Sequence, residues 1–273
     1  MGLSDVEVAI AAALAGAEVV ARSYGREHVR RPKTATDFAT ETDLAAERAI
    51  IDVLQTHRAA DARTGEELGD SGPRAARRWL VDPLCGTLNF AATTPLVAVN
   101  VALVEDGTSV AAAVADPLAD ELFWTDGSRA LVRRGDGPER LLGPTAVSRL
   151  IEINCDGPLD RPFVGGQLVH DPRLRAAYGP RVISSTLGVV WVAAGRRSSY
   201  VSDGSFDENL HFAAGIAIAE AAGCLVTDLA GDPLNTGRGL VVSADLATHH
   251  EVLELVQPHL SAVVMADRRG RDQ

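Results

Sequence analysis

Four apolar segments that follow one another at short intervals constrain the fold of this chain most. They are residues 96–104, 110–115, 121–124 and 130–133, and Asp106-Gly107 between the first two has the composition of a tight hairpin turn. Connections this short join antiparallel neighbours, because a parallel pair needs a crossover of roughly a dozen residues or more. The middle of the chain is therefore predicted to form an antiparallel meander.

The segments before the meander are predicted to be mainly helical. Ser4-Asp5-Val6-Glu7 matches a capping box, and the alanine- and valine-rich run behind it ends at a glycine, which predicts a helix over residues 5–24. A second helix is expected after Asp43. A short strand at 79–81 then runs into Asp82-Pro83, where the proline, which has no N–H, is expected to end the sheet ladder.

From about Arg149 the pattern changes to strands that alternate with helices, which is typical of α/β proteins. Strands are predicted at 150–154, 182–185, 199–201, 224–227 and 239–243, and helices at 187–194, 212–222 and near 250–256. No linker rich in proline, glycine or serine separates the two halves. The prediction is an α/β chain whose first half is α+β, with an N-terminal subdomain at 1–148 packed against a C-terminal subdomain at 149–273.

The charge of the chain restricts its partners. The net charge is −11 and the isoelectric point is near 5.1, whereas nucleic acid and anionic membranes attract proteins that present a positive field. We therefore expect neither as a partner. An anionic substrate would need a local positive charge, and a bound cation is the simplest source of one. No apolar run is long enough to span a bilayer, and the start of the chain lacks the order of a signal peptide, so a cytoplasmic protein is expected.

Carboxylates precede or end several predicted elements of the first half. Asp43 precedes a helix, Glu66-Glu67 follows a glycine turn, and Asp82 ends a strand. Two of these have a plain structural explanation, since Asp43 suits a helix cap and Glu66-Glu67 suits a solvated loop. Hard divalent cations such as Mg²⁺ nevertheless prefer carboxylate and carbonyl oxygens, and Gly86-Thr87 offers backbone N–H groups and a hydroxyl that can bind phosphate.

Four motifs occur together in an order that resembles the inositol monophosphatase family, the Mg²⁺-dependent phosphatases that include fructose-1,6-bisphosphatases and bisphosphate nucleotidases. They are Thr40–Asp43, Gly65–Glu67, Asp82–Thr87 and Leu210–Gly215, the last followed by an alanine-rich helix. The resemblance covers roughly residues 5 to 257. It implies a layered αβαβα sandwich, a homodimer, a phosphorylated small-molecule substrate and Mg²⁺ as cofactor.

The resemblance also implies roles for single residues. Glu66, Asp82 and the Leu84 carbonyl would hold a first cation, and Thr87 with Asp43 would assist the attacking water. The remaining assignments are Glu67 for a water-mediated contact to the cation, Gly86 and Thr87 for phosphate oxygens, and Lys33, the one lysine of the chain, for a position beside the substrate.

Two positions depart from the family pattern. Aspartates that would hold a second cation together with Asp82 are replaced by Cys85 and His211. In one reading, these three residues bind a softer ion such as Zn²⁺. In another, the second cation is lost and either Lys33 or protonated His211 lies at the leaving group, where His211 could act as a general acid. In a third, the site binds an anion without turning it over.

The substrate is less well marked. The polyol-binding glutamate of the family has no counterpart, and Ser185 and Asp207 are candidates for contacts with a sugar or polyol. The leading hypothesis is hydrolysis of a small sugar, polyol or metabolite phosphate by direct attack of water, with Mg²⁺, or Zn²⁺ or Mn²⁺ at the altered position. The alternatives are a non-hydrolytic lyase or cyclase and a non-catalytic ligand-binding protein.

Overall fold

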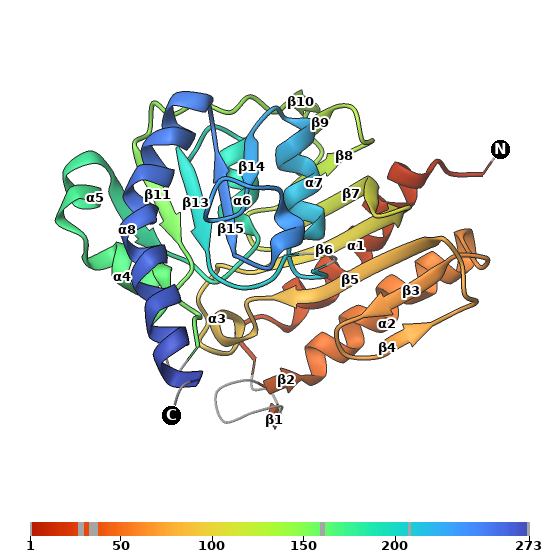
Figure 1. Ribbon diagram of the computed structural model, residues 1–273. Coiled ribbons are helices and arrows are strands. Elements are labelled where there is room, and N and C mark those ends of the chain that lie inside the picture. Colours follow the sequence, from red (N-terminus) through yellow and green to blue (C-terminus); the bar gives the residue numbers. More distant parts are fainter. Residues whose placement is uncertain (1, 27–29, 33–37, 159–161, 207–208, 272–273) are drawn as a thin grey trace. The chain divides into compact units, whose positions relative to one another are not determined.

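A computed structural model describes residues 2–26, 30–32, 38–158, 162–206 and 209–271 (Figure 1). The chain forms two compact units. The first comprises Met1–Leu141, Ser185–Val190 and Leu210–Ala221, and the second comprises Leu142–Ser184, Trp191–Asn209 and Ala222–Gln273. The long first stretch thus ends close to the predicted boundary at 148, and two later segments, one of which carries His211, fold with it.

The first unit is built on an eight-stranded sheet with the order β10-β9-β8-β7-β6-β5-β3-β4. β3 and β5 are parallel, and the other neighbours are antiparallel. The strands are β3 (Ala62–Gly65), β4 (Gly69–Ser71), β5 (Arg77–Cys85), β6 (Ala98–Glu105), β7 (Thr108–Asp116), β8 (Glu121–Thr125), β9 (Ala130–Arg134) and β10 (Arg140–Leu141). The helices are α1 (Asp5–Ser23), α2 (Glu41–His57), α3 (Thr87–Ala91) and α7 (Ala213–Ala221), and β1 (Arg30–Pro32) pairs separately with β2 (Phe38–Thr40).

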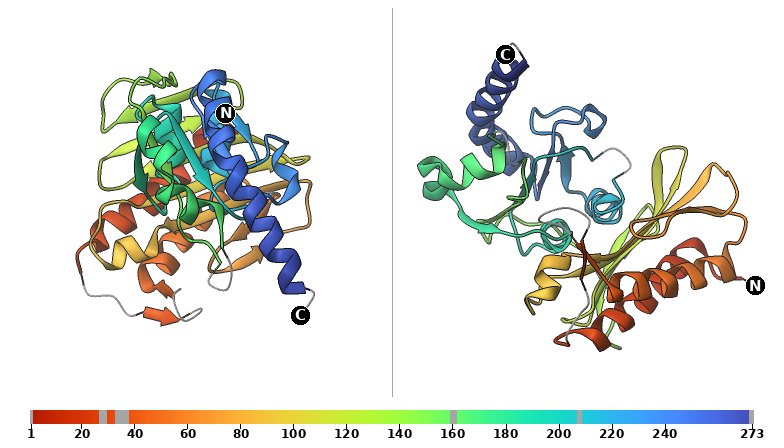
Figure 2. Two further views of the ribbon diagram at one scale, coloured as in Figure 1. Left: turned by 60° about the vertical axis from the view of Figure 1, so that its left-hand side comes forward. Right: turned by 90° about the horizontal axis from the view of Figure 1, so that it is seen from below.

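Helices cover both faces of this sheet. The right-hand view of Figure 2 shows α1 and α2 on one face and α7 on the other. Val99 and Val101 of β6 belong to the apolar core formed with α1 and α2. Since side chains alternate along a strand, Asn100 between them points to the opposite face. This face of the sheet therefore carries a polar residue that is completely buried.

The end of β5 differs from its prediction. Pro83 was expected to end the ladder, but the strand continues to Cys85. Asp82 pairs with Asn100 and Cys85 pairs with Ala98, so β5 carries one residue more than its partner between the two pairs. Such a bulge accommodates the missing N–H of the proline and redirects the side chains beyond it.

The second unit contains a five-stranded sheet with the order β12-β11-β13-β15-β14. Its strands are β11 (Leu150–Ile153), β12 (Gly179–Val182), β13 (Ser199–Ser202), β14 (Leu225–Thr227) and β15 (Leu240–Ser243). Its helical elements are α4 (Val164–His170), α5 (Pro172–Ala177), the 3-10 turn η1 (Leu234–Thr236) and α8 (Leu246–Arg271), while α6 (Leu187–Ala193) begins in the first unit and ends in the second. An apolar core that includes Ile151, Leu168 and Val252 joins the sheet to α4 and α8.

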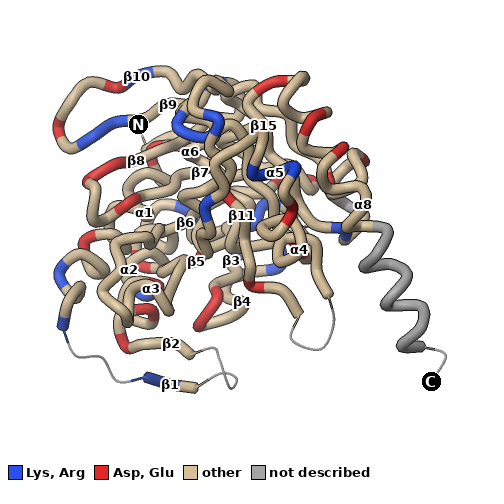
Figure 3. Tube along the Cα trace, turned by 90° about the vertical axis from the view of Figure 1, so that its left-hand side faces the viewer, with Lys and Arg blue, Asp and Glu red and all other residues tan. Residues whose placement is uncertain are grey.

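Most of the predicted elements are confirmed, including the first helix and the four strands of the meander. The strand expected at 182–185 lies earlier, at β12, and the last helix is much longer than predicted. Acidic and basic residues are interspersed along the elements, and β1 stands out as a basic segment (Figure 3). None of the described helices is long and apolar enough to cross a membrane.

Candidate active site

The hydroxyl of Thr87 connects two of the motifs. Its oxygen lies 3.0 Å from Asp43 Oδ1 and 3.2 Å from the carbonyl oxygen of Leu84. Asp43 lies at the start of α2, where its other oxygen, Oδ2, accepts hydrogen bonds from the backbone N–H and hydroxyl of Thr40 at 2.8 and 2.5 Å. One carboxylate therefore caps a helix with one oxygen and bonds to Thr87 with the other, a geometry that is compatible with both the structural and the functional interpretation of Asp43.

Burial changes the chemistry of Asp43. Its side chain is completely buried, and this burial raises the pKa of the carboxyl above its ordinary value, with a further contribution from nearby Glu67, although hydrogen bonds from Thr40 and Thr87 act in the other direction. A carboxylate with a raised pKa is a better proton acceptor, which is what a general base requires.

The segment that joins β5 to α3 makes a sharp turn at Gly86. The φ angle of Gly86 is 100°, a left-handed conformation that strongly favours glycine, and it lies directly before the first residue of α3, Thr87. Asp82 at the other end of the segment is completely buried, and its Oδ1 accepts a hydrogen bond from the N–H of Leu84 at 3.1 Å. The turn therefore fixes a carboxylate, a carbonyl and a hydroxyl within a few residues.

Glu47 is a buried carboxylate that the sequence analysis did not identify. It lies on α2 one turn after Asp43, and it accepts hydrogen bonds from the backbone N–H groups of Glu67 and Leu68 at 2.7 and 2.9 Å. A Cβ atom at Gly65 would lie 1.8 Å from Glu47 Oε1, so this glycine is required by the close approach. Glu47 thus fixes the turn that carries Glu66. Its spacing of four residues from Asp43, which places both on one helix face, was the available signal.

Three ligand atoms converge at this position. One atom each from Glu66, Asp82 and His211 lies within 4.8 Å of the others, and His211 Nδ1 is 2.9 Å from Asp82 Oδ2 and 3.9 Å from Glu66 Oε2. Two carboxylate oxygens and an imidazole nitrogen are a donor set that fits one divalent cation. Glu66 and Asp82, two of the three ligands expected for the first cation, therefore lie close together, with His211 beside them.

The side chain of Cys85 bonds to Thr186 and not to the converging ligand atoms. It is buried, and its sulfur accepts a hydrogen bond from the backbone N–H of Thr186 at 3.3 Å and lies 3.4 Å from the Thr186 hydroxyl oxygen. Its burial, with a further contribution from Asp82, raises the pKa of the thiol far above its ordinary value, which disfavours the thiolate that would bind a metal. Among the described residues, the sulfur does not belong to the group of converging ligand atoms.

The predicted substrate-binding residues differ in their placement. Gly86 and Thr87 lie beside the carboxylates as expected. Ser185 is almost completely buried, and its hydroxyl accepts a hydrogen bond from the N–H of Leu187 at 3.3 Å. Lys33 and Asp207 lie outside the described residues.

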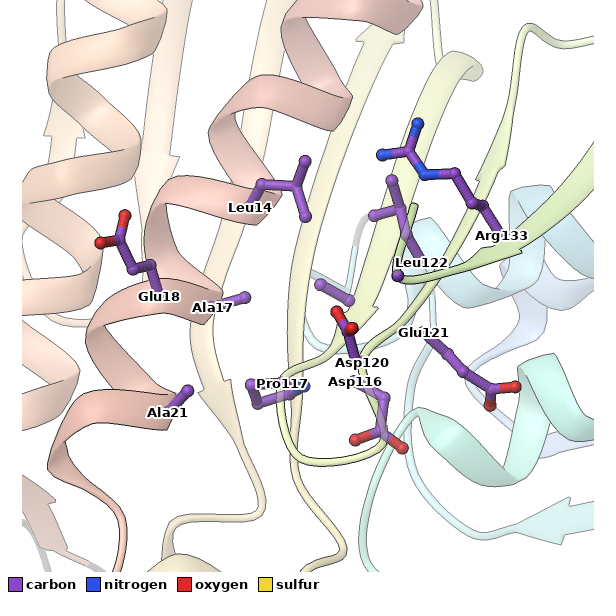
Figure 4. Close-up of a pocket in the computed structure, with 12 residues that line it drawn as sticks. Leu14, Ala17, Glu18, Ala21, Asp116, Pro117, Asp120, Glu121, Leu122 and Arg133 are labelled. Carbon is purple, nitrogen blue, oxygen red and sulfur yellow. The ribbon is translucent and has the colours of Figure 1, made fainter. Parts of the chain in front are cut away.

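A cavity of about 210 Å³ lies elsewhere in the first unit, between α1 and the strands β7 to β9 (Figure 4). Leu14 and Ala17 of α1 form one wall of it, opposite Leu122. Asp116, which also lines it, accepts hydrogen bonds from the backbone of the β7–β8 turn at 2.9 and 3.1 Å. Asp116 therefore stabilises this turn. None of the predicted site residues that the structure describes lines the cavity.

Comparisons with known proteins agree with the motifs. The sequence pattern of the inositol monophosphatase family matches residues 3–261. An inositol-1-monophosphatase of Caulobacter vibrioides is 31% identical over 90% of this chain and 98% of its own length, and the Nus factor SuhB of Pseudomonas aeruginosa is 31% identical over 93% and 96%. The crystal structure of the extragenic suppressor protein suhB from Bartonella henselae matches 92% of this chain and 97% of that chain, with 26% identity and a TM-score of 0.80. The predicted fold class, a layered αβαβα sandwich, is confirmed by these structural likenesses.

Proposed function

Because the chain belongs to the inositol monophosphatase family, a family of metal-dependent phosphoric monoester hydrolases, we propose that it hydrolyses the phosphate ester of a small sugar, polyol or other soluble metabolite. The observation that carries this proposal is the position of the Thr87 hydroxyl between Asp43 Oδ1 and the Leu84 carbonyl. This contact joins residues from separate motifs into one unit that can orient a water and accept its proton.

Glu66, Asp82 and the Leu84 carbonyl would hold the cation. When bound, it supplies Lewis-acid chemistry, lowering the pKa of water and neutralising charge on the phosphate. Thr87 Oγ1 takes up a proton from the attacking water as its own proton passes to Asp43 Oδ1, while the backbone N–H groups at the Gly86 turn bind phosphate oxygens. We expect direct attack of this water on phosphorus, without a covalent intermediate.

His211 acts on the leaving group. Asp82 Oδ2 fixes the imidazole through Nδ1, and the side chain is 42% exposed, which leaves it accessible to a substrate. We propose that His211 donates a proton to the departing oxygen. This replaces the charge stabilisation that a second cation would provide there.

Several finer properties belong to the same proposal. Magnesium suits the oxygen ligands, and Mn²⁺ or Zn²⁺ suits a set that includes the neighbouring imidazole. The acidic charge favours a small diffusible substrate over nucleic acid or membrane. We also propose that the protein is a homodimer located in the cytoplasm. Lys33, Ser185 and Asp207 stay candidates for contacts with the substrate.

Phosphate release from a panel of sugar, polyol and other metabolite phosphates tests the proposal, with Mg²⁺, Mn²⁺ and Zn²⁺ supplied separately. We expect release with at least one cation and loss of all turnover in Asp82→Asn. Unchanged turnover in that variant would refute the assigned site. Binding without release would favour the non-catalytic alternative, and an eliminated or cyclised product would favour the lyase or cyclase.

The leaving-group role of His211 has its own test. In His211→Ala, hydrolysis of alkyl phosphates should fall by about 10²-fold or more, because general acid catalysis typically contributes 10²–10⁴-fold, while nitrophenyl phosphate should be nearly unaffected because its leaving group needs no proton. An equal fall for both substrates would contradict the role. A fall that disappears at high cation concentration would instead identify His211 as a metal ligand.

A further inference from the structure

Asn100 lies directly opposite Asp82 in the ladder between β5 and β6, and it belongs to none of the recognised motifs. Its amide nitrogen, Nδ2, lies 3.3 Å from Asp82 Oδ2, 3.3 Å from Thr186 Oγ1 and 3.2 Å from the backbone carbonyl oxygen of His211. An amide nitrogen has only two hydrogens, so it already faces more acceptors than it can satisfy.

The orientation of this amide is informative. Asn100 is completely buried, and its own oxygen, Oδ1, has no hydrogen-bond partner within the described part of the chain. Turning the amide over would place that oxygen against the carboxylate of Asp82 and the carbonyl of His211, which are both acceptors. The donor side is therefore held toward Asp82 and His211 even though a buried acceptor stays unsatisfied, which is unfavourable by itself.

Thr186 completes the network. Its hydroxyl donates a short hydrogen bond to the carbonyl of His211, and its backbone N–H donates to the sulfur of Cys85. Asn100 and Thr186 together therefore contact Asp82, Cys85 and His211, the three residues that the sequence analysis assigned to a second cation. Each of these contacts is a hydrogen bond from a neutral group.

Both carboxylate oxygens of Asp82 already have hydrogen-bonding neighbours. Its Oδ2 lies within hydrogen-bonding distance of both His211 Nδ1 and Asn100 Nδ2, and its Oδ1 accepts the N–H of Leu84. A buried carboxylate needs compensation by donors or by cations, and here donors already supply much of it.

We propose that Asn100 and Thr186 are positioning residues that replace the second cation, so that the site holds a single divalent ion. They fix Asp82 and His211 relative to each other, and they keep the sulfur of Cys85 away from the ion. The inference rests on the cation site of the proposed function but not on hydrolysis, and metal binding can be measured whether or not the protein turns a substrate over.

Two measurements on the full chain determine how many ions bind and whether the sulfur of Cys85 is a ligand. Calorimetric titration with Mn²⁺ in the presence of inorganic phosphate should give one ion per chain. The Co²⁺-loaded protein should lack a thiolate-to-cobalt charge-transfer band and should have the same spectrum in Cys85→Ser. Two ions per chain, or a band that Cys85→Ser removes, would overturn the proposal.

Substitutions test the positioning role. Thr186→Val keeps the shape and the backbone N–H but removes the hydroxyl, and Asn100→Ala removes the amide. Each should weaken Co²⁺ binding by about 10- to 100-fold, as loss of a residue that orients metal ligands typically does, and should shift the visible spectrum of the bound ion. Thr125→Val is the matched control, because Thr125 is also completely buried and its hydroxyl oxygen accepts a hydrogen bond from the backbone N–H of Gly127, just after the end of β8.

Thermal unfolding of each variant shows that the compared proteins are folded. If Asn100→Ala fails to fold, Thr186→Val decides the question, since it leaves the packing volume unchanged. Co²⁺ affinity and spectra equal to those of the unmodified chain, or an equal loss in Thr125→Val, would refute the positioning role.

Discussion

Replacement of Thr87 by valine tests the proposed proton relay with little change in shape. Valine has nearly the volume of threonine but cannot donate to Asp43 Oδ1, at 3.0 Å, or to the Leu84 carbonyl, at 3.2 Å. The other oxygen of Asp43 keeps both donors from Thr40, so the cap of α2 should persist. The perturbation therefore separates the relay from the helix that carries it.

The expected magnitude follows from the contact. A hydrogen bond to a charged group is worth about 1.5–3 kcal/mol, and each 1.36 kcal/mol of barrier corresponds to a factor of ten. If most of this interaction is needed in the transition state, kcat should fall by about 10²-fold. KM should change little, because the substitution leaves intact the backbone N–H groups at the Gly86 turn that we propose bind the phosphate. The free energy of unfolding should change by only about 1 kcal/mol.

Steady-state phosphate release by Thr87→Val, Thr87→Ser and the unmodified chain provides the assay, together with chemical denaturation. Thr87→Ser retains the hydroxyl and should retain most of the activity. If Thr87→Val turns over as fast as Thr87→Ser, or if its loss lies in KM alone, the relay through this hydroxyl is wrong.

Three further predictions concern the groups around the site and the stability of the first unit. Asp82→Asn should weaken Mn²⁺ binding at least tenfold in calorimetry, and undiminished binding would exclude this residue as a ligand. Glu47→Ala leaves two backbone N–H groups without their acceptor, and it should lower the free energy of unfolding by about 1–3 kcal/mol per group in a denaturant titration. Gly65→Ala should lower the free energy of unfolding comparably, because its Cβ would lie 1.8 Å from Glu47 Oε1. Although burial acts to raise it, the hydrogen bonds from Arg77 and Arg58 hold the pKa of Asp5 below its ordinary value, so this ion pair stabilises the fold at neutral pH and is lost as the pH falls through the lowered value. Asp5→Asn should therefore show a smaller loss of stability than the unmodified chain on acidification below about pH 4, and parallel pH profiles would contradict this.

The local patterns of the sequence predicted much of the fold. The capping box at Ser4 and the turn at Asp106-Gly107 act within a few residues of themselves, so helix and hairpin follow from them directly. The continuation of β5 beyond Pro83 could not be predicted in this way. It depends on a bulge against β6, and that pairing joins residues far apart in the chain.

Prediction of the candidate site from the sequence was limited in the same way. Asp43, Glu66, Asp82 and Thr87 were identified because each lies in a short motif. Glu47 and Asn100 were missed because their roles come from contacts across the fold, with backbone N–H groups in one case and with residues of three segments in the other.

Cys85 shows that the interpretation of a substitution depends on neighbours that the sequence does not reveal. A cysteine at a position associated with metal binding suggests a softer ligand set. The structure instead surrounds its sulfur with the N–H and hydroxyl of Thr186, a residue about a hundred positions later in the chain. No spacing rule within the sequence connects the two.

Hydrolysis of an active substrate in ¹⁸O-labelled water tests the central claim most directly, with Asp43→Asn as the comparison. We expect inorganic phosphate that carries one solvent oxygen, an unlabelled alcohol product, and a rate that falls sharply in the variant. Label in the alcohol, a product formed by elimination, or unchanged turnover in Asp43→Asn would contradict direct attack of water on phosphorus at this site.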